Sequence, residues 1–174
     1  MFSGLRKKSI LKTINSQLNK REAYNGEIKL RKLGVLIDAR KDVDIFSIVK
    51  LADAIGVKSN QLQIMGFKDL KAHIEDDHVG QTNYFDEKMV KFTGGFTSES
   101  LNTFVEETFD VLINFYHEDY NILNLVASSS KAKFKVGFAS VDNRINDLVI
   151  GTPANNTDLF IKELKKYLKI LNII

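Results

Sequence analysis

A cluster of positive charges near the start of the chain is the set of residues best suited to binding chemistry. The basic side chains of the predicted helix over residues 5–22 are Arg6, Lys7, Lys8, Lys12, Lys20 and Arg21. Lys and Arg at this local density neutralise the phosphates of a nucleic-acid backbone, and release of the counterions supplies affinity that does not depend on base sequence. The segment therefore predicts a surface for RNA or for a ribonucleoprotein such as the ribosome.

The same predicted helix carries a narrow apolar stripe. Its members, at helical spacing, are Ile10, Leu11, Ile14 and Leu18. Such a stripe is suited to docking on a partner protein, which makes a protein–protein adaptor an alternative function. It is equally suited to packing on the rest of its own chain. A membrane surface is disfavoured, because Phe2 is the only large aromatic anchor near the helix.

A second set of polar residues follows the predicted strands. Its candidate ligand-binding members are Asp38, His117, Asp142 and Arg144. In open α/β sheets, ligands collect beyond the carboxyl ends of the strands, and these residues follow the predicted strands over 33–38, 109–115 and 133–139. If the four side chains converge in one pocket, they predict a small enzyme or a binder of a phosphate or sugar ligand. We assign none of them a catalytic role.

Other chemical motifs are absent or weak. The sequence contains no Cys, no GxSxG and no Gly-rich dinucleotide fingerprint after a strand. His73 and His78 flank several acidic residues, but a five-residue spacing does not place both rings on one helical face. We therefore predict an acidic surface loop there, no metal and no cofactor, and we favour a function that is not enzymatic.

The elements that position these residues follow from hydrophobic periodicity. Residues 33–38 form an apolar run typical of a buried strand. A helix is expected to begin after Asp42 or Asp44, which can cap its N-terminus, and to end at Gly56. Residues 61–67 then alternate as a strand does. This strand–helix–strand unit predicts a right-handed parallel crossover.

The second half of the chain repeats the alternation. Strands are expected at 88–92, 109–115, 133–139 and 147–150, and helices after Ser98 or Ser100, over 119–129 and over 155–172. Together these elements predict a three-layer, Rossmann-like α/β domain with a mostly parallel sheet of about five strands. We place this domain at 33–174 and treat 1–32 as a basic amphipathic helical extension.

Charge is distributed unevenly along the chain. The 174 residues carry a net charge of +3, but residues 1–33 carry +7, residues 34–130 carry −8 and residues 131–174 carry +4. Such asymmetry indicates an anionic partner, unless the basic ends pair with the acidic middle. The lysines that would extend the basic surface, if the two terminal helices were neighbours, are Lys162, Lys165, Lys166 and Lys169.

The length and the 44% hydrophobic content suit one domain with an ordinary core. No signal-peptide pattern and no apolar stretch long enough to span a bilayer is present, so we expect a cytoplasmic protein.

Two resemblances add to this interpretation. The stretches KKSILKTINSQLNKR, FDVLINF, SKAKFKVGFASVDNRINDLVI and LKKYLKIL resemble an uncharacterised family of short bacterial proteins, for which no activity is assigned. Residues 109–138, from FDVLINF to AKFKVGF, also look like the amino-terminal half of heptosyltransferase-type glycosyltransferases. Because the chain is too short for the second, nucleotide-sugar-binding domain of that fold, this likeness implies a Rossmann-like fold without retained transferase activity.

Overall fold

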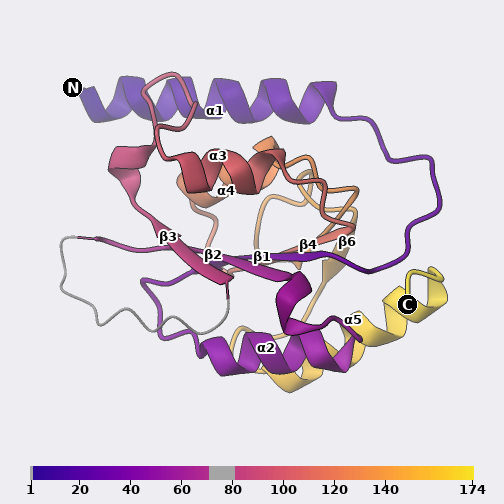
Figure 1. Ribbon diagram of the computed structural model, residues 1–174. Helices are drawn as coiled ribbons and strands as arrows, with labels where there is room; N and C mark the ends of the chain where they lie inside the picture. The colour runs from indigo at the N-terminus through magenta and orange to yellow at the C-terminus, as the bar shows by residue number, and fades with distance from the viewer. Residues whose placement is uncertain (1, 71–80) are drawn as a thin grey trace.

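The computed structural model describes residues 2–70 and 81–174, and its centre is a parallel β-sheet covered by helices on both faces (Figure 1). In the described residues the sheet has six strands, in the order β3-β2-β1-β4-β5-β6, and every neighbouring pair is parallel. The strands are β1 (Leu33–Asp38), β2 (Leu62–Phe67), β3 (Gln81–Phe85), β4 (Val111–Phe115), β5 (Phe134–Phe138) and β6 (Leu148–Ile150). The expected Rossmann-like α/β fold is confirmed, with one strand more than expected.

The strand order has a direct consequence for where a ligand would bind. From β1 the chain first adds β2 and β3 on one side, and then returns to add β4, β5 and β6 on the other. The connections that leave β1 and β4 therefore run in opposite directions and open a crevice beyond the carboxyl ends of these two strands, which is the usual binding position in open α/β sheets. Both strands are buried throughout, because helices cover both of their faces.

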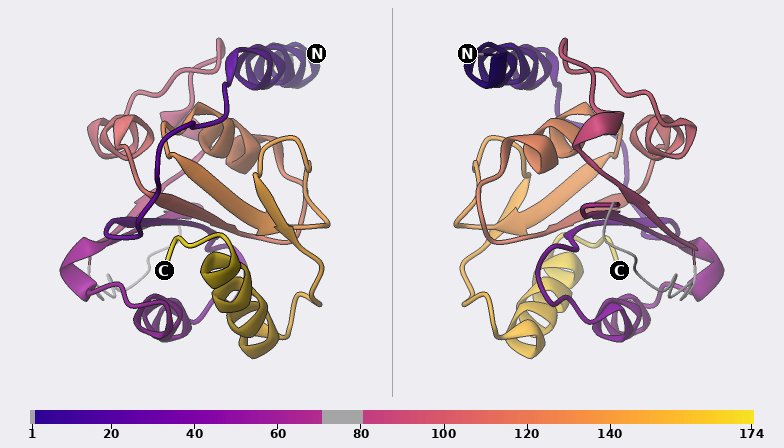
Figure 2. Two further views of the ribbon diagram at one scale, coloured as in Figure 1. Left: turned by 90° about the vertical axis from the view of Figure 1, so that its right-hand side faces the viewer. Right: turned by 90° about the vertical axis from the view of Figure 1, so that its left-hand side faces the viewer.

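The helices form one layer on each face of the sheet. Helices α2 (Ile45–Ala54) and α5 (Thr157–Ile170) cover one face, and α3 (Glu99–Glu106) and α4 (Asn121–Ser129) cover the other (Figure 2). Two short 3-10 turns, η1 (Ser59–Gln61) and η2 (Glu87–Met89), precede β2 and α3. The predicted caps are present: the Asp44 carboxylate accepts from the Phe46 N–H at 3.0 Å, and the Ser98 hydroxyl accepts from the Leu101 N–H.

The first helix, α1 (Phe2–Lys20), lies outside α4 as an additional layer (Figure 1). Residues 122–128 of α4 are all buried, because one side of that helix faces the sheet and the other faces α1. Ile10 and Ile14 of α1 are 3% and 2% exposed and belong to the same core cluster as α3 and α4. Ile10, Ile14 and Leu18 of the apolar stripe thus pack on the chain's own domain, while Leu11 stays exposed.

One predicted element is wrong, and one condition set for the basic surface is not met. The predicted strand at 88–92 is instead the end of η2 followed by Val90, which makes only an isolated antiparallel bridge to Phe96. The strand in this region is β3, whose sequence QTNYF is too polar to stand out. In addition, α5 lies on the face of the sheet opposite α1 (Figures 1 and 2), so its lysines do not extend the basic surface of α1.

Candidate nucleic-acid interface

Two of the six basic residues predicted to bind nucleic acid attach α1 to the domain. The Arg6 guanidinium donates to the Glu87 carboxylate at 3.2 Å, to the Glu87 carbonyl at 2.7 Å and to the Val90 carbonyl at 3.1 Å. Just beyond the other end of the helix, the Arg21 guanidinium pairs with the Asp147 carboxylate at 2.5 Å. Because both guanidinium groups are committed to internal partners, their first role is to hold the helix in place.

The other four basic residues remain open to solvent. Lys7, Lys8, Lys12 and Lys20 are exposed, and none of them forms an ion pair with any residue in 2–70 or 81–174. A shallow surface depression runs along the helix; its lining includes Lys8, Leu11, Lys12, Asn15, Asn19 and Lys20. The outer side of α1 therefore carries Lys8, Lys12 and Lys20 along its length, Lys7 lies on the flank beside Ile10 and Ile122, and no ion pair within the described structure neutralises these lysines.

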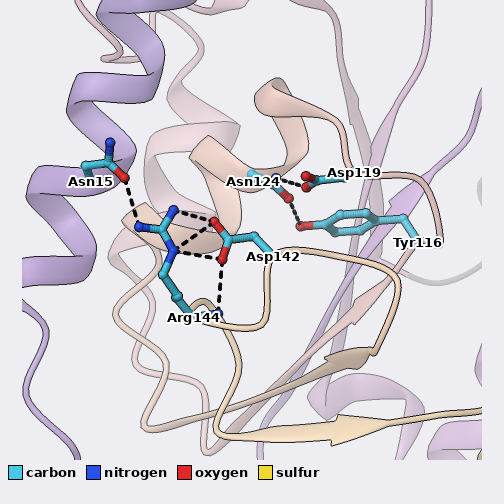
Figure 3. Close-up of polar contacts among 6 residues, drawn as sticks. All are labelled: Asn15, Tyr116, Asp119, Asn124, Asp142 and Arg144. Atoms are coloured by element: carbon cyan, nitrogen blue, oxygen red, sulfur yellow. Dashed lines mark hydrogen bonds and ion pairs between the residues drawn. The ribbon is translucent and has the colours of Figure 1, made fainter.

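A further cation reaches this helix from the loop that follows β5. The Arg144 guanidinium forms a bidentate pair with Asp142, with N···O distances of 2.9 and 2.6 Å, and donates to the Asn15 side-chain oxygen at 3.1 Å (Figure 3). The hydrogen bond and charge of Arg144 lower the pKa of Asp142. The pair predicted as part of a ligand site thus lies beside α1.

A buried polar network supports this corner of the fold. The Tyr116 hydroxyl donates to the Asn124 side-chain oxygen at 2.9 Å, and the Asn124 amide donates to Asp119 (Figure 3). Burial raises the pKa of Tyr116 well above its usual range, so the phenol remains a hydrogen-bond donor. This network ties the start of α4 to the segment after β4, and α4 in turn supports α1.

The four predicted strand-end residues do not line a common pocket. Asp38 lies beneath Arg40 and accepts from its guanidinium in two hydrogen bonds of 2.8 Å. Asp142 and Arg144 lie beside α1. His117 packs on the other face of the sheet, where its ring centroid is 3.7 Å from that of Phe138, and burial lowers its pKa. The ligand site predicted from these four residues needs all four side chains in one pocket, and the structure places them in three separate locations.

A crevice that sequence reasoning did not find lies around Arg40. The Arg40 guanidinium is 4.0 Å from the centroid of the Tyr120 ring and 4.8 Å from that of Phe67. The Tyr120 hydroxyl donates to Glu87, and burial together with this hydrogen bond raises the pKa of Tyr120 to about 12. The hydrogen bond to Asp38 raises the pKa of Arg40, so its charge is permanent. These residues meet only because β1, β2 and β4 are neighbours in the sheet.

Comparison with known proteins identifies the family. A family model for a group of unknown function, DUF6913, matches residues 6–171. The chain belongs to this family. No curated protein and no solved structure matches the DUF6913 chain. The bacterial source and the likeness of residues 109–138 to heptosyltransferase-type enzymes therefore remain predictions from the sequence.

The described part of the DUF6913 chain contains neither a candidate metal-binding cluster nor a helix that could cross a membrane. Within residues 2–70 and 81–174, no group of three or more His, Asp or Glu side chains is placed to hold a metal ion. The predicted acidic loop from His73 to His78 lies outside the described residues. Among the described helices, none is long and apolar enough to cross a membrane.

Proposed function

We propose that this protein is a non-enzymatic binding module that engages RNA or a ribonucleoprotein through the exposed side of α1. The observation that carries the proposal is the unpaired state of Lys7, Lys8, Lys12 and Lys20 in the described structure. Four ammonium groups along one helix favour binding to a polyanion, because each neutralised phosphate releases condensed counterions.

The attachment of α1 to the domain supports the proposal. Arg6 and Arg21 fix the helix near its two ends, and Ile10 and Ile14 bury its apolar side. The backbone that carries the lysines is thus ordered before binding, so only the lysine side chains lose freedom in the complex. In this proposal the four lysines contact phosphates, and Arg6 and Arg21 anchor the helix.

The adaptor alternative receives less support. Ile10 and Ile14 are buried against the chain's own core, so a partner would have to displace α1 to reach them. Leu11 is the member of the stripe that is most exposed, at 38%. A cytoplasmic, bacterial setting agrees with binding to ribosomal RNA and remains a prediction from the sequence.

The test is a filter-binding titration against ribosomal RNA at low salt with matched charge reversals. The variant Lys8→Glu/Lys12→Glu changes two exposed lysines of α1. The control Lys162→Glu/Lys165→Glu makes the same change of charge on α5, on the opposite face of the sheet. We expect the α1 variant to lose at least tenfold in affinity and the control to lose less than threefold. Equal losses in both variants, or no binding by the wild type, would refute the proposal.

A further inference from the structure

The crevice around Arg40 is a concave space next to the point where the strand order reverses. It lies beyond the carboxyl ends of β1, β2 and β3 and has a volume of about 340 Å³. Its walls include Arg40, Phe67, Lys68, Asp86, Glu87 and Tyr120. This volume is at the lower end of the range for small-molecule sites, roughly 300–1,000 Å³. The space therefore suits a small ligand rather than a polymer.

The carboxylates at this crevice are already engaged. Glu87 accepts hydrogen bonds from Tyr120 with one side-chain oxygen and from Arg6 with the other. Asp86 accepts from the backbone N–H of Lys88 at 2.9 Å, and this bond caps the 3-10 turn η2. Asp69 at the edge of the crevice also has a partner of its own. The negative charges thus stabilise the walls.

The cations at the crevice are only partly engaged with other groups of the described structure. Lys68 is only 5% exposed, and its ammonium lies 3.5 Å from the centroid of the Tyr84 ring. Lys88 is exposed. Neither lysine forms an ion pair with a carboxylate in the described part of the chain. Arg40 donates to Asp38 through Nε and Nη2, and its Nη1 has no such partner among the described residues.

From this arrangement we infer that the crevice binds a small molecule through a phosphate group. The Lys68 ammonium rests on the Tyr84 ring and has no carboxylate beside it in the described residues, so a nearby anion would add charge compensation. Lys88 and the free edge of the Arg40 guanidinium favour an anion with several acceptor oxygens, and Lys68 adds positive charge beside them. The rings of Phe67 and Tyr120 provide an apolar wall for the rest of the ligand. The residues of this site are distinct from the four lysines proposed to bind RNA.

The test is a titration of the full-length protein with inorganic pyrophosphate, followed by the ¹H–¹⁵N NMR spectrum. We expect saturable shifts for the amide signals of Lys68, Lys88 and Tyr120. The variant Lys68→Gln/Lys88→Gln is expected to weaken pyrophosphate binding at least tenfold. The control Lys91→Gln removes an exposed lysine of a nearby segment that does not line the crevice, and it is expected to bind as the wild type does.

Several outcomes would overturn the inference. The wild type could show no saturable shifts, or shifts only in α1. The double variant could bind pyrophosphate as tightly as the wild type, or the wild type could bind the dicarboxylate succinate equally tightly. Because Lys88 is exposed, the single variant Lys88→Gln keeps the test informative if the buried change at Lys68 disturbs folding; it is expected to weaken binding at least threefold. The variant Lys8→Glu/Lys12→Glu is expected to bind pyrophosphate normally, which separates this site from the proposed RNA surface.

Discussion

Arg6 and Glu87 are 81 positions apart in sequence, and the Arg6 guanidinium donates hydrogen bonds to both the side chain and the backbone carbonyl of Glu87. The other oxygen of the Glu87 carboxylate accepts from Tyr120, which lies over Arg40. The Glu87 carboxylate therefore both holds α1 in place and forms part of the wall of the crevice around Arg40. This contact explains how a helix that is separate in sequence becomes a fixed part of the domain surface.

We predict that Arg6→Ala lowers the free energy of unfolding by about 1–3 kcal/mol, because it removes hydrogen bonds from a charged donor to Glu87 and Val90. The measurement is equilibrium denaturation in urea. Lys7→Ala is the matched control, since Lys7 has no ion-pair partner among the described residues, and it is expected to change stability by less than about 0.5 kcal/mol. Equal stability of the Arg6 variant and the wild type would contradict the anchoring role.

The buried side of α1 gives a second prediction. Ile14 is 2% exposed, so Ile14→Ala is expected to cost about 2–5 kcal/mol through lost burial and the cavity that remains. Leu11→Ala alters a side chain that is 38% exposed, and it is expected to cost less than about 1.5 kcal/mol. The measurement is thermal or urea unfolding of both variants. A small effect at Ile14 would mean that α1 is not part of the cooperative fold.

The third prediction concerns the pH dependence of stability. Lys135 is fully buried, its ammonium nitrogen lies 2.7 Å from the Ala127 carbonyl oxygen, and burial lowers its pKa from 10.5 to about 7. Between pH 10.5 and pH 7 the unfolded chain holds a proton at this lysine that the folded chain lacks. Falling pH therefore destabilises the fold across this window, and below pH 7 this contribution no longer changes.

The variant Lys135→Met removes this titration and keeps a similar volume. Its advantage in stability over the wild type is expected to grow from pH 10 to pH 7 by up to about 4 kcal/mol and then to level off. Urea denaturation of both proteins between pH 6 and pH 10 provides the measurement. Identical pH profiles would show that Lys135 keeps its ordinary pKa in the folded protein.

Local sequence signals predicted the elements well. The apolar run of β1 and the Asp44 cap of α2 depend on neighbouring residues only, and both are found where expected. Strand β3 was not predicted because it is an edge strand whose first three residues, Gln81, Thr82 and Asn83, are all polar, which removes the apolar signal. The predicted strand at 88–92 failed because Asp86 caps a 3-10 turn there.

The candidate sites were harder to predict than the elements. Sequence identified the basic residues of α1, but it did not show that Arg6 and Arg21 have partners more than 80 positions away. The contact of Arg40 with Tyr120 depends on β1 lying next to β4, which is a property of strand order. The sequence likewise did not show that α1 and α5 lie on opposite faces of the sheet. Hydrophobic periodicity and charge pattern do not reveal contacts between segments that are distant in the sequence, and the candidate sites depend on such contacts.

The most direct test of the central claim is the salt dependence of binding to single-stranded ribosomal RNA. Each phosphate contact is expected to contribute about 0.7 to the magnitude of the slope of log Kobs against log salt, so four lysines predict a slope of about −2.8. Lys8→Gln/Lys12→Gln removes two of these contacts and is expected to reduce the magnitude to about 1.4. An unchanged slope in this variant, or a slope near zero in the wild type, would contradict binding through α1.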